Sequence, residues 1–269
     1  MPVQALVLAL GSAVLHALWN LLLGRARDVE AAAAVTFALS VAIALPFAVV
    51  FWHADPSVWP YALASSLLET AYVLGLAYAY RTADVSVVYP LTRGLAPVLA
   101  LAAAVAFLGH RPSATEVGGV VVVSAGVLLV RGGAGGARGR TLVLSTAIAA
   151  SIAAYTLVDR AGIQRAGAIT YFVLVLALPC LVAAPLNGVA AMRRELGAAT
   201  AVAALANLGS FVLGLLALRH GPAAPVLAVR STSIVITALL AGRLLAERVS
   251  RTRLAGAVLV FAGVALLAF

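Results

Sequence analysis

The chain has 269 residues, of which 64% are hydrophobic and only 10% are charged. A soluble domain carries charge on about a quarter of its residues, so this composition excludes an ordinary soluble domain and indicates a membrane protein. All 18 positive charges are arginines, which against 9 acidic residues give a net charge of +9, and most of them lie in short clusters between apolar runs. Such clusters contact anionic headgroups, so the charge does not predict binding to nucleic acid.

Taken in chain order, ten apolar runs are long enough to predict transmembrane helices of about 20 residues each. The runs cover residues 3–23, 31–52, 58–80, 85–108, 114–130, 141–159, 168–190, 197–218, 222–245 and 252–268. The separators between them are too short to hold a soluble domain. Because the runs are apolar throughout and do not alternate, they predict helices and not barrel strands. The predicted fold is an all-α, multi-pass membrane protein of ten transmembrane helices, located in the cell inner or plasma membrane.

The two halves of the chain resemble each other. The segment "LGHRPSATEVGGVVVVSAGVLLV" aligns with "LAERVSRTRLAGAVLVFAGVALL", so that Gly119 falls on Gly256 and Gly126 on Gly263. The predicted division is a first five-helix repeat over 1–131, a connector rich in Gly and Arg over 132–140, and a second repeat over 141–269. Five is an odd number, so the copies enter the membrane from opposite sides. Such an inverted repeat suits alternating access.

An arginine stands inside the fourth run, in the stretch "VVYPLTRGLAPVL". Arg93 aligns with Arg230 in the ninth run, and an intramembrane charge is by default a candidate functional residue. The pair is predicted to line a central cavity, although a structural or snorkelling arginine is the alternative. Pro90 and Pro97 flank Arg93 and are candidates for a helix break or gate, because each removes a backbone donor. A simple packing kink is the other interpretation.

Glu69 is an acidic residue deep in the third run, and its counterpart in the second half is Asn207. Three roles stay open for Glu69: a structural counter-ion of Arg93, a proton-coupling carboxylate, or a substrate contact. Asp159 ends the sixth run and is predicted to cap the helix or to pair with Arg160.

Three polar or aromatic residues share one face of the first run, namely His16, Trp19 and Asn20. Tyr155 is the residue of the second half that aligns with Trp19, and Tyr89 lies one turn before Arg93. All five are candidate cavity residues, with interhelical hydrogen bonding or interface anchoring as the alternative. The aligned glycines of the fifth and tenth runs are predicted to be helix-packing seams.

The duplicated closing segments resemble the EamA-like transporters of the drug/metabolite transporter superfamily over essentially the whole chain. In the first half, His110 occupies the position of the loop glutamate that is usual in that family. The resemblance therefore assigns the loop glutamate only to Glu247. The stretches "HALWN" and "VVYPLTRG" also resemble a subset associated with phosphonate utilisation. The resemblance implies export or exchange of small metabolites such as amino acids and related compounds.

The sequence therefore predicts a secondary active transporter of a small polar or anionic metabolite. Motifs of lipid-linked enzymes and a nucleotide-binding loop are not found, so neither an enzyme nor a cofactor or metal is predicted. A lipid-headgroup flippase or an intramembrane enzyme remains the alternative. The predicted partners are the substrate and the lipid bilayer; protons or a counter-substrate, and a monomer or a homodimer, are left open. The arginine clusters favour termini outside the cytoplasm, whereas the family resemblance favours termini inside.

Overall fold

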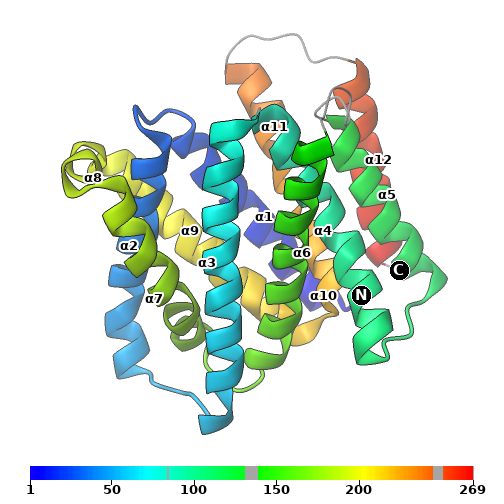
Figure 1. Ribbon diagram of the computed structural model, residues 1–269. Coiled ribbons are helices and arrows are strands. Elements are labelled where there is room, and N and C mark those ends of the chain that lie inside the picture. The colour runs from blue at the N-terminus through cyan, green and yellow to red at the C-terminus, as the bar shows by residue number, and fades with distance from the viewer. Residues whose placement is uncertain (84, 131–138, 245–250, 269) are drawn as a thin grey trace.

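The computed structural model is a bundle of helices (Figure 1). It describes residues 1–83, 85–130, 139–244 and 251–268. The described residues contain no strand, apart from an isolated bridge between Ala54 and Ala166. Glu247 and most of the predicted connector lie outside the described residues. The first-repeat helices are α1 (Val3–Leu23), α2 (Val29–Val50), the 3-10 turn η1 (Pro56–Val58), α3 (Trp59–Thr82), α4 (Val85–Leu108) and α5 (Ala114–Val130). The second-repeat helices are α6 (Gly139–Gly162), α7 (Ala168–Asn187), α8 (Val189–Glu195), α9 (Ala198–His220), α10 (Ala223–Arg230), α11 (Ser233–Leu244) and α12 (Arg251–Ala268).

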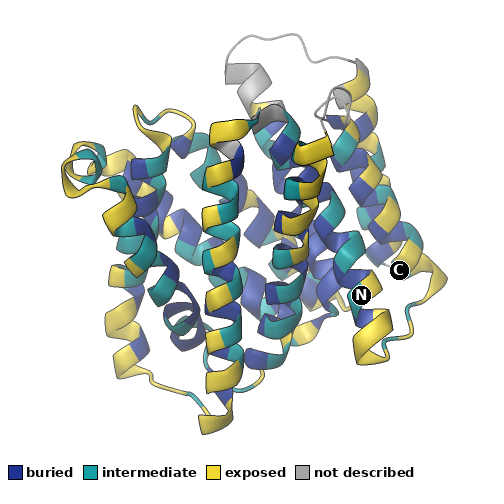
Figure 2. Cartoon of the chain, in the orientation of Figure 1, coloured by how far each residue is buried: buried dark blue, intermediate teal, exposed yellow. Residues whose placement is uncertain are grey.

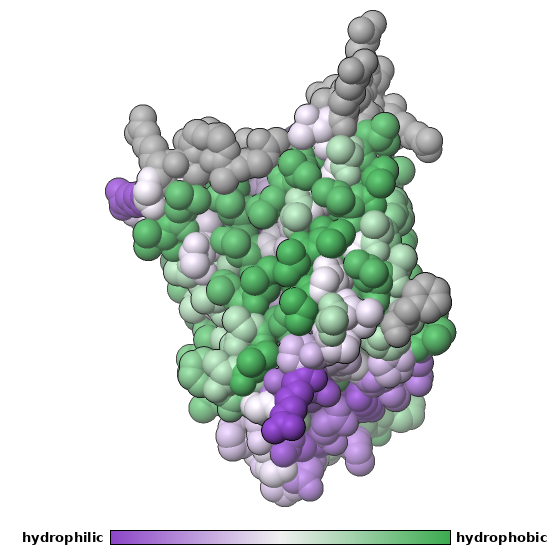
Figure 3. All heavy atoms as spheres, turned by 90° about the vertical axis from the view of Figure 1, so that its right-hand side faces the viewer, coloured by the Kyte–Doolittle hydropathy of each residue, from purple (hydrophilic) through white to green (hydrophobic). Residues whose placement is uncertain are grey.

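Seven of the helices are long and apolar enough to cross a membrane. These are α1, α2, α3, α4, α6, α7 and α9, and the remaining three predicted runs form shorter apolar helices. Large apolar side chains such as Phe107, Val258 and Phe261 are exposed. Exposed and partly exposed residues run along the outward faces of the helices (Figure 2). Apolar side chains cover most of the face over α5 and α12, and hydrophilic ones gather at its lower end (Figure 3). Apolar surface this continuous is expected of a protein surrounded by lipid.

The prediction of one continuous helix over 222–245 is wrong. The helix ends at Arg230 and restarts at Ser233, so α10 and α11 are separate. The Ser231 hydroxyl donates to the carbonyl of Leu227 at 3.0 Å, and the Thr232 N–H donates to Val229, three residues back. A serine that bonds to its own helix in this way, together with tightened three-residue turns, interrupts the regular ladder.

The expected helix break at Pro90 and Pro97 is not present, because α4 runs unbroken through both prolines. Pro97 acts instead on a single carbonyl. It has no N–H to donate to the carbonyl of Arg93, four residues earlier. The hydroxyl of Ser231, beyond the end of α10, lies 3.3 Å from that carbonyl and shares its single proton between it and the Leu227 carbonyl. The proline therefore leaves a backbone acceptor through which the two repeats contact each other.

The seventh predicted run also ends early. Its helix, α7, ends at Asn187, and Gly188 then adopts a positive φ of 72°. Glycine takes this left-handed conformation without steric cost. The chain turns there into the short helix α8, which no apolar run had indicated.

The helix contacts repeat with two-fold regularity. Helix α1 packs on α9 as α6 packs on α3, and α2 packs on α9 as α7 packs on α3. The glycine seams are confirmed between α5 and α12, where a Cβ on Gly126 would lie 2.7 Å from the Gly256 carbonyl oxygen. A Cβ on Gly263 would likewise lie 2.9 Å from the carbonyl oxygen of Gly119. Since Gly119 aligns with Gly256 and Gly126 with Gly263, the two contacts are exchanged copies of each other.

Candidate substrate-binding cavity

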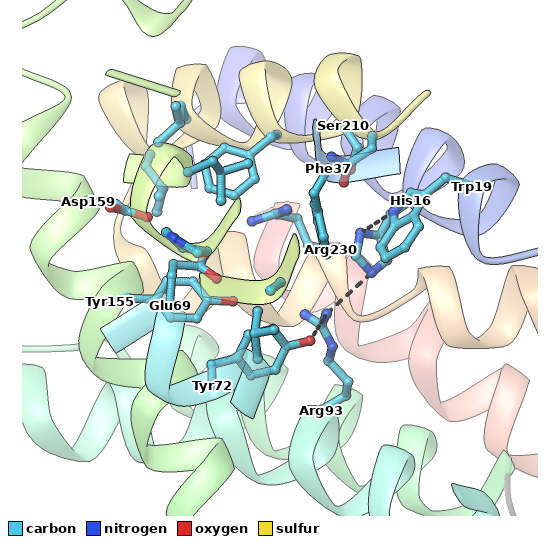
Figure 4. A pocket seen from close by; sticks show the side chains of 18 residues that line it. His16, Trp19, Phe37, Glu69, Tyr72, Arg93, Tyr155, Asp159, Ser210 and Arg230 are labelled. Atoms are coloured by element: carbon cyan, nitrogen blue, oxygen red, sulfur yellow. Dashed lines mark hydrogen bonds between the residues drawn. The ribbon is translucent and has the colours of Figure 1, made fainter. Parts of the chain in front are cut away.

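A cavity lies between the two repeats, near the middle of the bundle, and contains about 750 Å³ of unfilled space including its open side. Helices α1 to α4 of the first repeat and α6, α7, α9 and α10 of the second contribute to its wall (Figure 4). Its lining comprises His16, Trp19, Phe37, Glu69, Tyr72, Val73, Arg93, Tyr155, Asp159, Leu176, Pro179, Ala183, Asn207, Ser210, Phe211, Leu215, Leu218 and Arg230. This combination of an apolar wall with a few convergent polar groups is typical of small-molecule sites.

Arg93 reaches the cavity from α4 and lies beside two aromatic residues of the first repeat. Its Nη2 is 3.3 Å from the Tyr72 hydroxyl and 3.3 Å from His16 Nε2, and its guanidinium lies 5.9 Å from the ring centres of Tyr72 and Tyr89. The Trp19 indole N–H also approaches His16, at 3.1 Å from Nδ1. A neutral imidazole has one acceptor nitrogen, so His16 accepts from Trp19 or from Arg93, not from both at once.

Arg230 reaches the same cavity from the end of α10. Its Nε donates to the Ser12 hydroxyl at 2.9 Å, and Ser12 in turn donates to the Ser210 carbonyl at 2.6 Å. Ser210 returns the bond by donating to the Ser12 carbonyl at 2.9 Å. A Cβ at Gly214 would lie 2.8 Å from Arg230 Cζ, so a glycine on α9 leaves room for the guanidinium. Arg230 is thus positioned by a hydrogen bond to a serine of α1 in the first repeat and by the space that a glycine of α9 leaves in the second.

The carboxylates of the cavity have different environments. Asp159 is 2% exposed, and its Oδ1 accepts from the Ser65 hydroxyl at 2.5 Å and from the Tyr171 hydroxyl at 3.0 Å. The prediction that Asp159 pairs with Arg160 is wrong, because α6 extends to Gly162 and turns Asp159 inward. Arg160 donates instead to the Gly221 carbonyl at 3.0 Å.

Glu69 is 4% exposed and directs its carboxyl group into the cavity (Figure 4). Within the described parts of the chain it accepts no hydrogen bond. The ion pairs among the described residues are Arg81–Glu30 and His110–Glu116, so Glu69 shares the cavity with Arg93 without a direct ion pair to it.

The remaining candidates lie in and around the same cavity. Tyr155 lines it and packs edge-on against Tyr72, with ring centres 6.0 Å apart. Asn207 lines it and donates to the Ser40 hydroxyl at 3.1 Å. Asn20 donates to the carbonyl of His16 on its own helix, and the Tyr89 ring centre lies 5.9 Å from the Arg93 guanidinium. Pro90 and Pro97 stay in the body of α4, away from the lining.

The sequence reasoning missed several lining residues, chiefly Phe37, Tyr72, Phe211, Ser210 and the inward-facing Asp159. The aromatic residues gave no signal, because an aromatic in an apolar run is as easily lipid-facing. Asp159 did give a signal, because it is a carboxylate that directly follows the apolar stretch "YTLV". In the structure it still lies within α6, which continues for three more residues.

At one end of the bundle, loops of the two repeats are joined through their backbones. The Asp55 N–H donates to the Arg165 carbonyl at 2.8 Å, and the Gly167 N–H donates to the His53 carbonyl at 2.7 Å. The Arg165 guanidinium also lies 4.3 Å from the ring centre of Tyr61. Hydrogen bonds from Ser57 lower the pKa of Asp55 within this loop. We call the two backbone bonds the loop latch.

Comparison with known proteins identifies the family. The sequence profile of the EamA-like transporter family matches residues 3–132 and again residues 139–269. The chain belongs to the EamA-like transporter family. That family is part of the drug/metabolite transporter superfamily, so the predicted resemblance is confirmed.

The EamA fold of this chain is also found in a solved crystal structure. The two agree with a TM-score of 0.76 over 99% of this chain and 96% of the other, at 17% sequence identity. Identity this low establishes the fold alone. Among curated proteins, none matches this EamA-like chain.

Proposed function

We propose that this EamA-like chain is a secondary transporter that exports or exchanges a small polar or anionic metabolite across the cell inner or plasma membrane. The observation that carries the proposal is the cavity between the repeats, with one arginine contributed by each repeat. A buried guanidinium binds carboxylate or phosphonate oxygens through paired N–H donors.

The remaining lining limits the size and charge of the substrate. Aromatic side chains from both repeats, including Tyr72, Tyr155 and Phe211, offer apolar contact to its uncharged part. Glu69 and Asp159 repel a second anionic group and attract an ammonium group. Amino acids and small phosphonates combine these properties.

The proposed mechanism is alternating access between inverted repeats. The two-fold exchange of helix contacts supports it, because one repeat can then rock against the other around the central cavity. The loop latch closes the first repeat onto the second at one end of the bundle. Opening at that end breaks the latch, and closing at the other end brings the equivalent loops together. The driving force is an ion gradient or substrate exchange.

The test is a thermal-shift screen of purified protein against amino acids, phosphonates, nucleobases and organic acids, followed by uptake into proteoliposomes. A bound anion raises the melting temperature according to its concentration and affinity. Arg93→Ala and Arg230→Ala are each expected to abolish that shift and the uptake while the protein stays folded.

Arg81→Ala is the matched control, because Arg81 pairs with Glu30 at the exposed end of α3. It is expected to transport like the wild type. Wild-type uptake by both cavity variants would overturn the assignment of the cavity.

A further inference from the structure

Two buried carboxylates face the same cavity and differ in how the protein satisfies them. Asp159 accepts two hydrogen bonds, from Ser65 on α3 and Tyr171 on α7. Glu69, one turn beyond Ser65 on α3, is 4% exposed and has no protein donor in the described structure. Donated hydrogen bonds stabilise a carboxylate as an anion. The two hydrogen bonds therefore favour the anionic form of Asp159, whereas for Glu69 only the charges around it do so.

Those charges come from several helices. Glu69 shares the cavity with the cations Arg93 and Arg230 and with the carboxylate of Asp159. Two cations and two carboxylates balance one another. Besides Glu69, the titratable and charged groups that line this space in the described part of the chain are, by helix, His16 on α1, Tyr72 on α3, Arg93 on α4, Tyr155 and Asp159 on α6, and Arg230 on α10.

An anion that enters this balanced cavity leaves it with an excess negative charge. In a space of low dielectric constant such an excess is costly, and uptake of one proton removes it. The proton comes from the aqueous phase and joins one carboxylate oxygen, which turns the carboxylate into a neutral carboxylic acid. Protonation of Asp159 would weaken the two hydrogen bonds that its Oδ1 accepts, whereas Glu69 has no such bonds to weaken.

We propose that Glu69 is a proton-binding site whose occupancy is linked to the binding of an anion by Arg93 and Arg230. The inference rests on the proposed function and adds its coupling ion. Linkage is reciprocal, so the proton strengthens anion binding by the same factor by which the anion strengthens proton binding. One proton then crosses the membrane together with each anion, in the direction set by the sum of their two gradients.

The test uses protons alone as the probe and needs no substrate. Infrared difference spectra of the protein in lipid bilayers are recorded over a pH series, and the C=O stretch of protonated carboxyl groups is followed. The spectrum of the wild type minus that of Glu69→Gln isolates the contribution of Glu69. We expect a protonated-carboxyl band that grows on acidification and is missing in Glu69→Gln.

Arginine variants reproduce the charge of a bound anion. Arg230→Gln or Arg93→Gln removes one positive charge, which leaves the cavity with the same net charge as an arriving anion. The Glu69 band is expected to reach half its height about one pH unit higher in either variant than in the wild type. Arg81→Gln, outside the cavity, is expected to leave that midpoint unchanged. The two cavity variants are independent, so one suffices if the other does not fold.

Two results would overturn the inference: no Glu69-dependent band at any pH at which the protein stays folded, or the same midpoint in the wild type and in the folded arginine variants. Failure of the proposed function gives a different pattern. Absent uptake with a shifting Glu69 band refutes transport and keeps the proton site, whereas normal uptake without the band refutes the proton site alone.

Discussion

The two repeats are most alike where they pack on each other and least alike around the cavity. The glycines of α5 and α12 form the same contact twice, with roles exchanged. Arg93 and Arg230 also occupy equivalent positions, but Arg93 lies in an unbroken α4 beside Tyr72 and His16, whereas Arg230 ends α10 beside Ser12.

The difference extends to the loops. The residue that caps α7, Gly167, donates to a backbone carbonyl across the repeat boundary, at 2.7 Å. The residue that caps α2, Asp28, donates across the same boundary to an exposed side-chain oxygen of Glu195, at 3.1 Å. The packing of the helices therefore follows the two-fold repeat. The surroundings of the two arginines and the loop contacts at the two ends of the bundle do not.

The largest expected effect comes from the glycine seam, where the repeats are equivalent. Gly126→Val and Gly263→Val each place a side chain within 3 Å of the facing helix. Overpacking of this kind is expected to cost about 3 kcal/mol in either variant. Size-exclusion profiles and melting temperatures of the purified proteins measure it.

Gly118→Val is the matched control, because the nearest atom to a Cβ there is 4.0 Å away, at the end of Leu266. It is expected to melt near the wild type. A large difference between Gly126→Val and Gly263→Val would break the equivalence of the two seam contacts.

The second prediction concerns the contact between α4 and the break after α10. Ser231→Ala removes the hydroxyl that donates to the partly buried Arg93 carbonyl, and loss of a donor to such an acceptor costs about 1–3 kcal/mol. Adding Pro97→Ala supplies a backbone N–H four residues after Arg93, so the double variant is expected to regain much of the stability. Chemical denaturation of the two single variants and the double variant measures the coupling. Strictly additive effects would contradict the assigned role of Pro97.

A smaller effect is expected at the loop latch. Gly167 has a φ of −61°, which proline also adopts, so Gly167→Pro removes the N–H donor without forcing that angle. Loss of one hydrogen bond costs about 1 kcal/mol, which corresponds to about a fivefold faster opening of this end. Hydrogen–deuterium exchange of the 53–58 and 162–168 segments measures it.

Gly167→Ala is the control for the latch variant. It keeps the N–H, and its Cβ would lie 3.6 Å from the nearest atom, which is an ordinary contact. It is expected to exchange like the wild type. Equal exchange in the proline and alanine variants would show that the bond to His53 does not close this end.

The smallest expected effect is a pH dependence of the same loop. The pKa of Asp55 is lowered from its ordinary 3.8 by hydrogen bonds from Ser57, so its stabilising contribution is present above that value and is lost as the pH falls through the folded-state value. Exchange of the 53–58 segment is expected to rise slightly below about pH 4 in the wild type. Asp55→Ala should show no such rise. A rise of equal size in Asp55→Ala would assign it to another group.

Much of the frame could be predicted from the sequence. Each apolar run forms helix, and seven of the helices can span a membrane. The duplicated glycines forecast the seam between α5 and α12, because spacing of seven places them on one helix face. The arginine pair and most of its predicted neighbours do lie around one cavity. Hydropathy and periodicity are local properties, so both can be read from a single run of residues without knowing its neighbours in space.

Other features depended on which distant segments meet. The break after Arg230 arises from hydrogen bonds of Ser231, one of them to a carbonyl that Pro97 leaves open on another helix. Asp159 faces inward because Ser65 and Tyr171, from two other helices, donate to it. Sequence alone determined the helices, their duplication and the charges buried among them. Only the tertiary structure decided which donor reaches which acceptor, because those partners are brought together by packing between helices and not by any pattern within one.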